Sequence, residues 1–481
     1  MPKKINKNLC YLILLIPVIY TFTITIRQEC DIWFLFSHGR YVLNHGFPHT
    51  DFLTMHSGLH LVMQQWLSSI IFYIFYKAFG TLGIYFIVWI SNFIIIFLLY
   101  KLAMKITNNN MFISSIIAAI IDSLLEFAAI TSRPIIFSLI IYILVLYIME
   151  SYRKKESKII YFLILLSLLE VNLHASMWPI LFILLGPYVV HYTYLYFKDQ
   201  NKFIFKLLIV ILLMILVGFI NPYGIEAMTY SLRSYGVADI NNVIWEMNGL
   251  NLNSDLAYVK FFGYITLFVM IGVTYIFIRS KKKVDFYKLL FLYGTYFMAL
   301  LNIRNTSLFF IVSIIFCSEY INNKSKLIND LNLKYKALYV LMFILLIFVV
   351  ISNKDRYVLS DEYSGQKKVL EYMNKNIDKN EPVFTINNNG GYYSYNGYKT
   401  YIDTRAELFL KVNNHKADIF HEYYLLLNEK LDYEEFLNKY NFKYLVISPR
   451  EPMSLFVYIK TNDNYHLLYK SKRTYLYMKN D

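Results

Sequence analysis

Long apolar runs recur along the chain as far as residue 352, and they restrict the fold more than any motif does. The first covers residues 9–26, and the longest covers residues 82–106. A helix needs about 20 apolar residues to cross a bilayer. Of the 481 residues 57% are hydrophobic and 17% charged, whereas soluble domains are roughly half apolar and a quarter charged. The sequence therefore predicts a mainly α, polytopic membrane protein.

Clusters of lysine and arginine indicate the orientation of the predicted spans. They fall in every second connection, at 101–105, 153–158, 198–206, 279–288 and 324–336. Cytoplasmic loops are enriched in these residues, so we predict a multi-pass protein of the cell membrane with a cytoplasmic N-terminus and an extracytoplasmic C-terminus. About eleven spans follow: 9–26, 82–106, 112–130, 134–151, 158–172, 177–197, 202–220, 258–279, 286–302, 306–322 and 336–352.

The polar segments divide the chain into two predicted domains. Residues 1–352 form the transmembrane domain, in which residues 27–80 are a first outer loop with interfacial helices, one of them at 61–79. Residues 353–481 form a small extracytoplasmic α/β domain. Its expected elements are helices at 365–376, 416–429 and 433–440, strands at 382–386, 399–402 and 444–448, a turn at Gly390-Gly391, and a hairpin of 464–470 with 473–478.

The charge and the cysteine content favour neither nucleic acid nor a metal. The net charge of +14 is explained by cytoplasmic lysines beside an anionic lipid surface, so we predict no nucleic-acid partner. The three cysteines show no disulfide or metal spacing. The first outer loop carries His38, His45, His49 and His56, but their spacings do not form a compact ligand pair for zinc. No metal ligand is assigned, and a divalent cation stays open as a cofactor.

Several predicted outer turns carry residues that are costly near hydrocarbon. A charged side chain at the centre of a membrane helix costs about 2.5–3.5 kcal/mol, and such groups usually face a water-filled cavity. Snorkelling of single side chains to the interface is the alternative. Because all of them lie on one predicted side, we expect them to share a cavity. They are Arg133, Asn172, His174, Asn221, Glu246 and Arg304.

Asp31 is the candidate catalytic base. It follows the first apolar run, and partial removal from water at the membrane edge would raise the pKa of its carboxyl. That suits a general base that takes a proton from an acceptor hydroxyl. A carboxylate there could equally hold a metal, orient the acceptor, or be a solvated acid at a helix end.

The order of these motifs resembles the C-type (GT-C) superfamily of membrane glycosyltransferases, near the protein-O-mannosyltransferases and the aminoarabinose transferases. The resemblance covers nearly the whole chain. It rests on Asp31-x-Trp33, Gly39-Arg40, Gly46-x-Pro48, Asp51, Trp66-Leu67, Arg133-Pro134, Asn172-x-His174, Asn221-Pro222-x-Gly224, Gly390-Gly391-Tyr392 and Ile402-Asp403-x-Arg405-x-Glu407.

The resemblance implies transfer of a sugar from a polyprenyl-phosphate donor to a glycan, lipid or protein acceptor at the outer face of the membrane. It implies Asp31 and Asp51 as catalytic acids, and Arg133, His174 or Arg304 as groups that neutralise the donor phosphate. Trp33, Trp66, Asn172, Asn221 and Glu246 would line the site.

The sequence also departs from the pattern of this superfamily. Arg133 stands where members often have a second acid, and Gln64-Gln65 stands where an acid often precedes Trp66-Leu67. An inert assembly or binding subunit is therefore an alternative to the enzyme. A lipid or polysaccharide transporter is another, although inverted repeats and broken helices are not evident.

Overall fold

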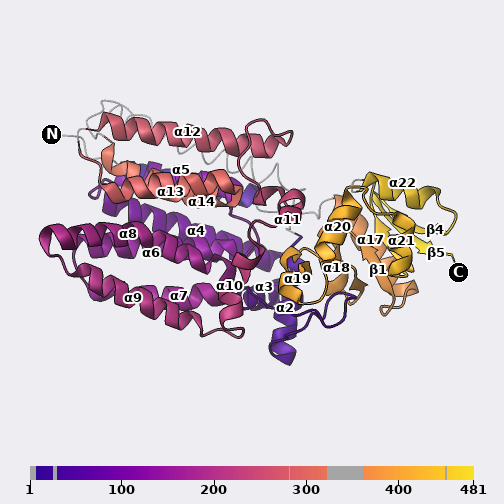
Figure 1. The fold of residues 1–481 in the computed structure, drawn as a ribbon. Helices are drawn as coiled ribbons and strands as arrows, with labels where there is room; N and C mark the ends of the chain where they lie inside the picture. Colours follow the sequence, from indigo (N-terminus) through magenta and orange to yellow (C-terminus); the bar gives the residue numbers. More distant parts are fainter. Residues whose placement is uncertain (1–6, 25–29, 281, 322–360, 450–451, 481) are drawn as a thin grey trace. The chain divides into compact units, whose positions relative to one another are not determined.

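The computed structural model describes residues 7–24, 30–280, 282–321, 361–449 and 452–480. The chain divides into two compact units (Figure 1). The helical unit comprises Met1–Arg27, Ile84–Met228 and Ile244–Asn353, and the mixed unit comprises Gln28–Gly83, Thr229–Val243 and Lys354–Asp481.

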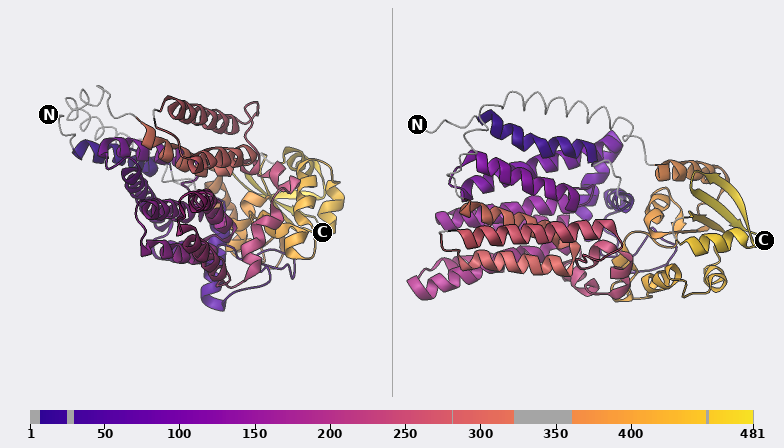
Figure 2. Two further views of the ribbon diagram at one scale, coloured as in Figure 1. Left: turned by 60° about the vertical axis from the view of Figure 1, so that its left-hand side comes forward. Right: turned by 90° about the horizontal axis from the view of Figure 1, so that it is seen from above.

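The helical unit is a bundle of apolar helices that run side by side (Figure 2). Helix α1 packs on α5, α5 on α14, α14 on α12 and α13, α13 on α8, and α7 on α9. The bounds are α1 Lys7–Ile24, α4 Thr81–Ile106, α5 Met111–Ala128, α6 Ile135–Lys154, η1 Lys158–Tyr161, α7 Phe162–Leu173, η2 Ala175–Met177, α8 Trp178–Asp199, α9 Phe203–Gly218, η3 Trp245–Met247, α12 Ala257–Arg279, α13 Phe286–Leu301, η4 Ile303–Asn305, α14 Thr306–Cys317 and η5 Ser318–Tyr320. Helix α10, Ile225–Ser234, begins in this unit and ends in the mixed unit.

The helices of this unit begin and end within a few residues of most predicted spans. Among the described residues, five segments are long and apolar enough to cross a membrane: Thr81–Ile106, Met111–Ala128, Ile135–Lys154, Ala175–Asp199 and Ala257–Arg279. The mainly helical class with a small sheet is confirmed. The number of eleven spans and the orientation of the termini stay predictions, and the span at 336–352 lies outside the described residues.

The mixed unit contains a five-stranded sheet in the order β2-β1-β3-β5-β4. The β1 strand pairs parallel to β2 and β3, and β5 pairs antiparallel to β3 and β4. The strands are β1 Pro382–Thr385, β2 Lys399–Thr400, β3 Tyr444–Ile447, β4 Tyr465–Ser471 and β5 Thr474–Lys479. The helices are α2 Ile32–His45, α3 Trp66–Phe79, α11 Ala238–Val243, α17 Asp361–Asn376, α18 Asn387–Tyr395, η8 Ala406–Phe409, α19 Lys411–Asn414, α20 Ile419–Leu427, α21 Tyr433–Lys439 and α22 Met453–Thr461.

The predicted first outer loop packs with the C-terminal segment. Residues 27–80 are predicted as part of the transmembrane domain, whereas the structure groups Gln28–Gly83 with Lys354–Asp481. Thr54 bridges to Thr400 at the β2 edge of the sheet, and the Met55 amide donates to the Thr400 carbonyl at 2.9 Å. Unpaired strand edges favour such additional pairing. The difference arises because backbone pairing between distant segments leaves no signal in hydrophobic periodicity.

The turn predicted at Gly390-Gly391 is wrong, because both glycines lie inside helix α18. A side chain at Gly390 would come within 1.8 Å of the Ile402 carbonyl oxygen, so only glycine lets the helix approach that backbone. The glycine pair therefore serves close packing. The strand predicted at 399–402 is shorter, since β2 ends at Thr400, and the helix predicted at 416–429 is α20, Ile419–Leu427.

Candidate active site

Two arginines from different connections of the helical unit meet on one carboxylate. Arg133 precedes α6 and Arg304 lies in η4. Arg133 Nη1 lies 2.8 Å from Glu246 Oε1, and Arg304 Nη2 lies 2.9 Å from the same oxygen. The three side chains are between 23% and 31% exposed, so the cluster is reachable from solvent.

Backbone hydrogen bonds position Glu246 beside Arg304. The Ile303 amide donates to the Asn248 carbonyl at 2.9 Å, and the Leu250 amide donates to the Leu300 carbonyl at 3.1 Å. The segment that follows η3 is thereby tied to the end of α13 and to η4. A side chain at Gly249 would come within 2.6 Å of the Leu300 carbonyl oxygen, so glycine permits this approach.

The conformation of η4 is fixed by its own cap. The Asn302 side-chain oxygen accepts from the Arg304 amide at 2.9 Å, and Asn305 donates to the Met298 carbonyl at 3.1 Å. At the other arginine, Pro134 is the N-cap of α6, a position that tolerates its missing N–H group. Both guanidinium groups therefore extend from rigid helix starts.

Opposing charges determine the ionisation of Glu246. Burial would raise the pKa of its carboxyl, but the charges and hydrogen bonds of Arg304 and Arg133 outweigh burial and hold the pKa at about 2. Glu246 is thus a carboxylate at neutral pH. The cluster carries two positive charges and one negative charge, and it retains a net charge of +1 for an anionic ligand.

His174 lies near the two arginines but is not a cation. It caps the end of α7, and its Nδ1 is 3.1 Å from Ser138 Oγ. Burial, together with the charges of Arg304 and Arg133, lowers the pKa of His174 to about 3. A neutral imidazole cannot supply the positive charge that the resemblance implied, although it can form a hydrogen bond.

The two asparagines predicted to line the site organise the backbone. Asn172 donates to the carbonyls of Leu168 and Ile220, which joins the end of α7 to the segment after α9. Asn221 donates to the Gly218 and Gly224 carbonyls and accepts from the Tyr223 amide. Asn172 and Asn221 thus hold the backbone of these connections, and their predicted place in the lining of the site stays a prediction.

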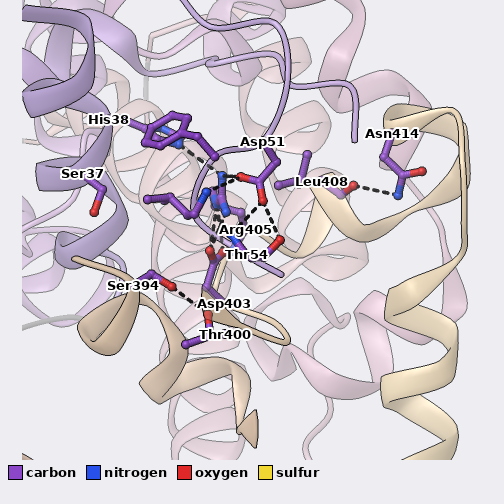
Figure 3. A network of polar contacts seen from close by, with 12 residues as sticks. Ser37, His38, Asp51, Thr54, Ser394, Thr400, Asp403, Arg405, Leu408 and Asn414 are labelled. Atoms are coloured by element: carbon purple, nitrogen blue, oxygen red, sulfur yellow. Dashed lines mark hydrogen bonds and ion pairs between the residues drawn. The ribbon is translucent and has the colours of Figure 1, made fainter. Parts of the chain in front are cut away.

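Asp51 belongs to a buried network in the mixed unit (Figure 3). Its carboxylate accepts from Arg405 Nη1 at 2.7 Å, from Thr54 Oγ1 at 2.5 Å and from the Thr54 amide at 3.0 Å. Burial would raise the pKa of Asp51, but the Arg405 charge and the hydrogen bonds from Thr54 and Arg405 hold the pKa at about 2. These partners make the Asp51 carboxylate part of a buried ion-pair network, and the catalytic role that the resemblance implies for Asp51 stays a prediction.

Arg405 is the centre of this network. It donates from Nε to both carboxylate oxygens of Asp403 at 2.9 and 3.0 Å, and from Nη2 to one of them at 2.6 Å. Its Nη1 also lies 3.3 Å from His38 Nε2. Burial and the Arg405 charge hold the pKa of His38 well below its usual value, so the neutral ring accepts this hydrogen bond. Asp403 and Arg405 therefore pair with each other inside this network.

Replacing Arg405 by alanine is expected to destabilise the mixed unit by about 3–5 kcal/mol, because two buried carboxylates lose their counter-ion. Hydrogen-exchange mass spectrometry of the full-length protein in detergent measures the loss of stability as a loss of amide protection. Peptides that cover 46–65 and 394–416 should lose protection together, while the exposed control Arg473→Ala should not change. Unchanged protection in Arg405→Ala would contradict the structural role of the network.

The other predicted residues lie elsewhere in the mixed unit. Asp31 is the half-buried N-cap residue of α2. Trp33 is buried against Tyr392 and Tyr395, with ring centroids at 4.8 and 5.6 Å. Trp66 begins α3 and meets the Phe47 ring edge-on at 5.1 Å. The structure therefore brings together Arg133, His174, Glu246 and Arg304 within the helical unit, whereas Asp31, Asp51, Trp33 and Trp66 belong to the mixed unit.

The loop histidines have separate partners. His38 contacts Arg405, His45 packs on Tyr41, and a His56 ring nitrogen lies 2.8 Å from the Tyr401 carbonyl oxygen. Within the described ranges, no three side chains of His, Cys, Asp or Glu gather so that they could hold a metal ion. We therefore derive no step through a metal.

Solved structures with the same architecture are known. ArnT from Cupriavidus metallidurans, bound to undecaprenyl phosphate, superposes with a TM-score of 0.57 and 10% identity over 97% of each chain. The oligosaccharyltransferase of Archaeoglobus fulgidus in its apo form gives a TM-score of 0.54 and 12% identity over 91% of this chain and 69% of that one. The complex of the Archaeoglobus fulgidus enzyme with an inhibitory peptide and a dolichol-phosphate superposes with a TM-score of 0.51 and 13% identity. The match covers 98% of this chain and 74% of that one.

These likenesses establish the class of fold. The chain has the fold of the C-type (GT-C) membrane glycosyltransferases, as its motif order indicated. No protein-family model matches the sequence, and no curated protein does.

Proposed function

We propose that this chain is a membrane glycosyltransferase that moves a sugar from a polyprenyl-phosphate donor to an acceptor at the outer face of the membrane. The observation that carries the proposal is the paired approach of Arg133 and Arg304 to one anionic group. Structures with a similar fold hold undecaprenyl phosphate or a dolichol-phosphate, which supports a lipid phosphate as the ligand.

In the proposed reaction the acceptor hydroxyl oxygen attacks the anomeric carbon of the donor. The new glycosidic bond forms while the bond between that carbon and the phosphate oxygen breaks, and the polyprenyl phosphate leaves with the electron pair. Asp31 takes the hydroxyl proton, the role that the resemblance assigns to it. Arg133 and Arg304 stabilise the negative charge that develops on the phosphate, because fixed cations act most strongly where charge appears in the transition state.

In the absence of donor, the Glu246 carboxylate would then occupy the place between the two arginines that the donor phosphate takes when it binds. One of its two carboxylate oxygens, Oε1, accepts a hydrogen bond from each arginine. A phosphate has more oxygens, so each guanidinium could form two parallel hydrogen bonds with it. A phosphate that binds both arginines must take over the contacts that Glu246 now makes. Glu246 is therefore proposed as an internal competitor that keeps the two guanidinium groups in place.

Mass spectrometry of lipids extracted from the purified protein tests the donor class. Polyprenyl phosphate, with or without a sugar, should co-purify with the native chain and be lost from the variant that combines Arg133→Gln with Arg304→Gln. Arg279→Gln, an exposed arginine at the end of α12, is the matched control and should retain the lipid. Equal retention by all three proteins would contradict the assignment of the phosphate to this pair.

Glu246→Gln is expected to strengthen binding of undecaprenyl phosphate about tenfold, equivalent to about 1.4 kcal/mol, because the competing negative charge is gone. Titration of the detergent-solubilised protein, followed by native mass spectrometry, measures the change. Weaker binding in Glu246→Gln would show that the carboxylate orients the arginines for the phosphate and does not compete with it.

A further inference from the structure

A cavity of about 220 Å³ lies within the mixed unit, between α2, the loop that follows it and the start of β2. Its volume is below the roughly 300–1,000 Å³ of sites for drug-sized ligands. Tyr41 and Phe52 both line the cavity, and their rings stack on each other with centroids 4.0 Å apart. Aromatic side chains in a cavity of this size suit one sugar ring better than an extended chain.

Two cations belong to this cavity, and each is held by a backbone carbonyl. Arg40 Nη2 donates to the Tyr395 carbonyl at 2.8 Å, and its guanidinium lies over the Tyr395 ring, 4.5 Å from the centroid. Lys399 Nζ donates to the Phe52 carbonyl at 2.8 Å. In the part of the chain that the structure describes, neither cation pairs with a carboxylate, and no acidic residue lines the cavity.

The walls of the cavity are rigid because they adjoin the Arg405 network. Ser37 and Leu53, which line it, are neighbours in sequence of His38 and Thr54, two members of that network. Ser394, which also lines the cavity, shares a hydrogen bond of 2.7 Å with Thr400 (Figure 3). The two cations therefore extend from fixed elements, and a ligand would not have to order them.

We propose that this cavity binds a single sugar residue that carries a phosphate or a carboxylate. Arg40 and Lys399 bind the anionic group, since charged hydrogen bonds of this kind are about twice as strong as neutral ones. Tyr41 and Phe52 contact the ring. The anionic sugar comes either from a soluble molecule or from a lipid headgroup. The cavity shares no lining residue with the arginine pair of the helical unit, and binding in it does not depend on sugar transfer.

Isothermal titration of the full-length protein in neutral detergent with mannose 6-phosphate tests the proposal. Arg40→Gln and Lys399→Gln should each weaken binding about tenfold, the factor that 1.4 kcal/mol represents. The exposed residues Arg473 and Lys411 provide the matched controls Arg473→Gln and Lys411→Gln, which should bind normally. Mannose without phosphate should bind at least about tenfold more weakly.

Three results would overturn the proposed binding site: no saturable binding of mannose 6-phosphate, equal binding of mannose, or equal binding by the Arg40 and Lys399 variants and their controls.

Nanodiscs of phosphatidylcholine with or without phosphatidylinositol then identify whether the natural ligand is a soluble molecule or a lipid headgroup. Competition by phosphatidylinositol that both variants abolish supports the site and identifies a lipid headgroup. Unchanged mannose 6-phosphate binding in these nanodiscs supports the site with a soluble ligand. The variant Arg133→Gln with Arg304→Gln should bind mannose 6-phosphate normally, so failure of the donor site and failure of this one are distinguishable.

Discussion

Replacing Asp31 by asparagine is expected to lower the rate of sugar transfer by about 10²–10⁴-fold, the usual contribution of a general base. Asparagine has nearly the same shape but cannot take the acceptor proton. The residue stands at the start of α2 and is half-buried, so the change should leave the fold intact. The measurement is transfer of radiolabelled sugar from a polyprenyl-phosphate donor by the protein in native membrane vesicles, whose endogenous acceptors are present.

Asp463→Asn is the matched control for this experiment, because Asp463 is an exposed acid of the mixed unit. Its transfer rate and thermal midpoint should equal those of the native chain. Full activity of Asp31→Asn would remove the proposed base. Donor binding without transfer by the native chain itself would favour the inert binding subunit over the enzyme.

Loss of either guanidinium in the helical unit is expected to reduce transfer by about 10²–10³-fold, the cost of removing one preorganised group that stabilises developing charge. Arg133→Gln and Arg304→Gln keep a hydrogen-bond donor but lose the charge. The combined variant should lose less than the product of the two single losses, because both arginines contact the same group. Initial rates over a range of donor concentrations up to saturation measure the maximal rate and the apparent donor affinity.

The control for these rates is Arg279→Gln, which has the same overall charge as each single arginine variant. A fall in apparent donor affinity with an unchanged maximal rate would mean that the arginines bind donor and transition state equally. Unchanged transfer rates in both arginine variants would instead mean that the donor phosphate does not bind between Arg133 and Arg304.

The helices of the helical unit could be predicted because their signal is local. Helix α4, for instance, spans Thr81–Ile106 where a continuous apolar run predicted 82–106, and α12 spans Ala257–Arg279 where 258–279 was predicted. Such segments need no distant partner to form their backbone hydrogen bonds. The cost of charged groups near hydrocarbon predicted that polar residues of the outer turns would lie close together, and the side chains of Arg133, Glu246 and Arg304 meet, with His174 near the two arginines.

The state and role of single polar residues could not be predicted, because they depend on partners far away in the sequence. Asp51 was expected as a catalytic acid, and no sequence pattern showed that it pairs with Arg405, 354 residues further on. His174 was expected to carry charge, but burial beside two arginines keeps it neutral. Glu246 was expected only to line the site. Its bridging position depends on the hydrogen bond between the Ile303 amide and the Asn248 carbonyl, which no sequence pattern reveals.

An experimental structure of the protein with undecaprenyl phosphate bound would test the central claim most directly. The account predicts phosphate oxygens at hydrogen-bond distance, about 2.7–2.9 Å, from both Arg133 and Arg304, with the Glu246 carboxylate displaced from at least one of them. A phosphate bound elsewhere, with both arginines still on Glu246 Oε1, would contradict it.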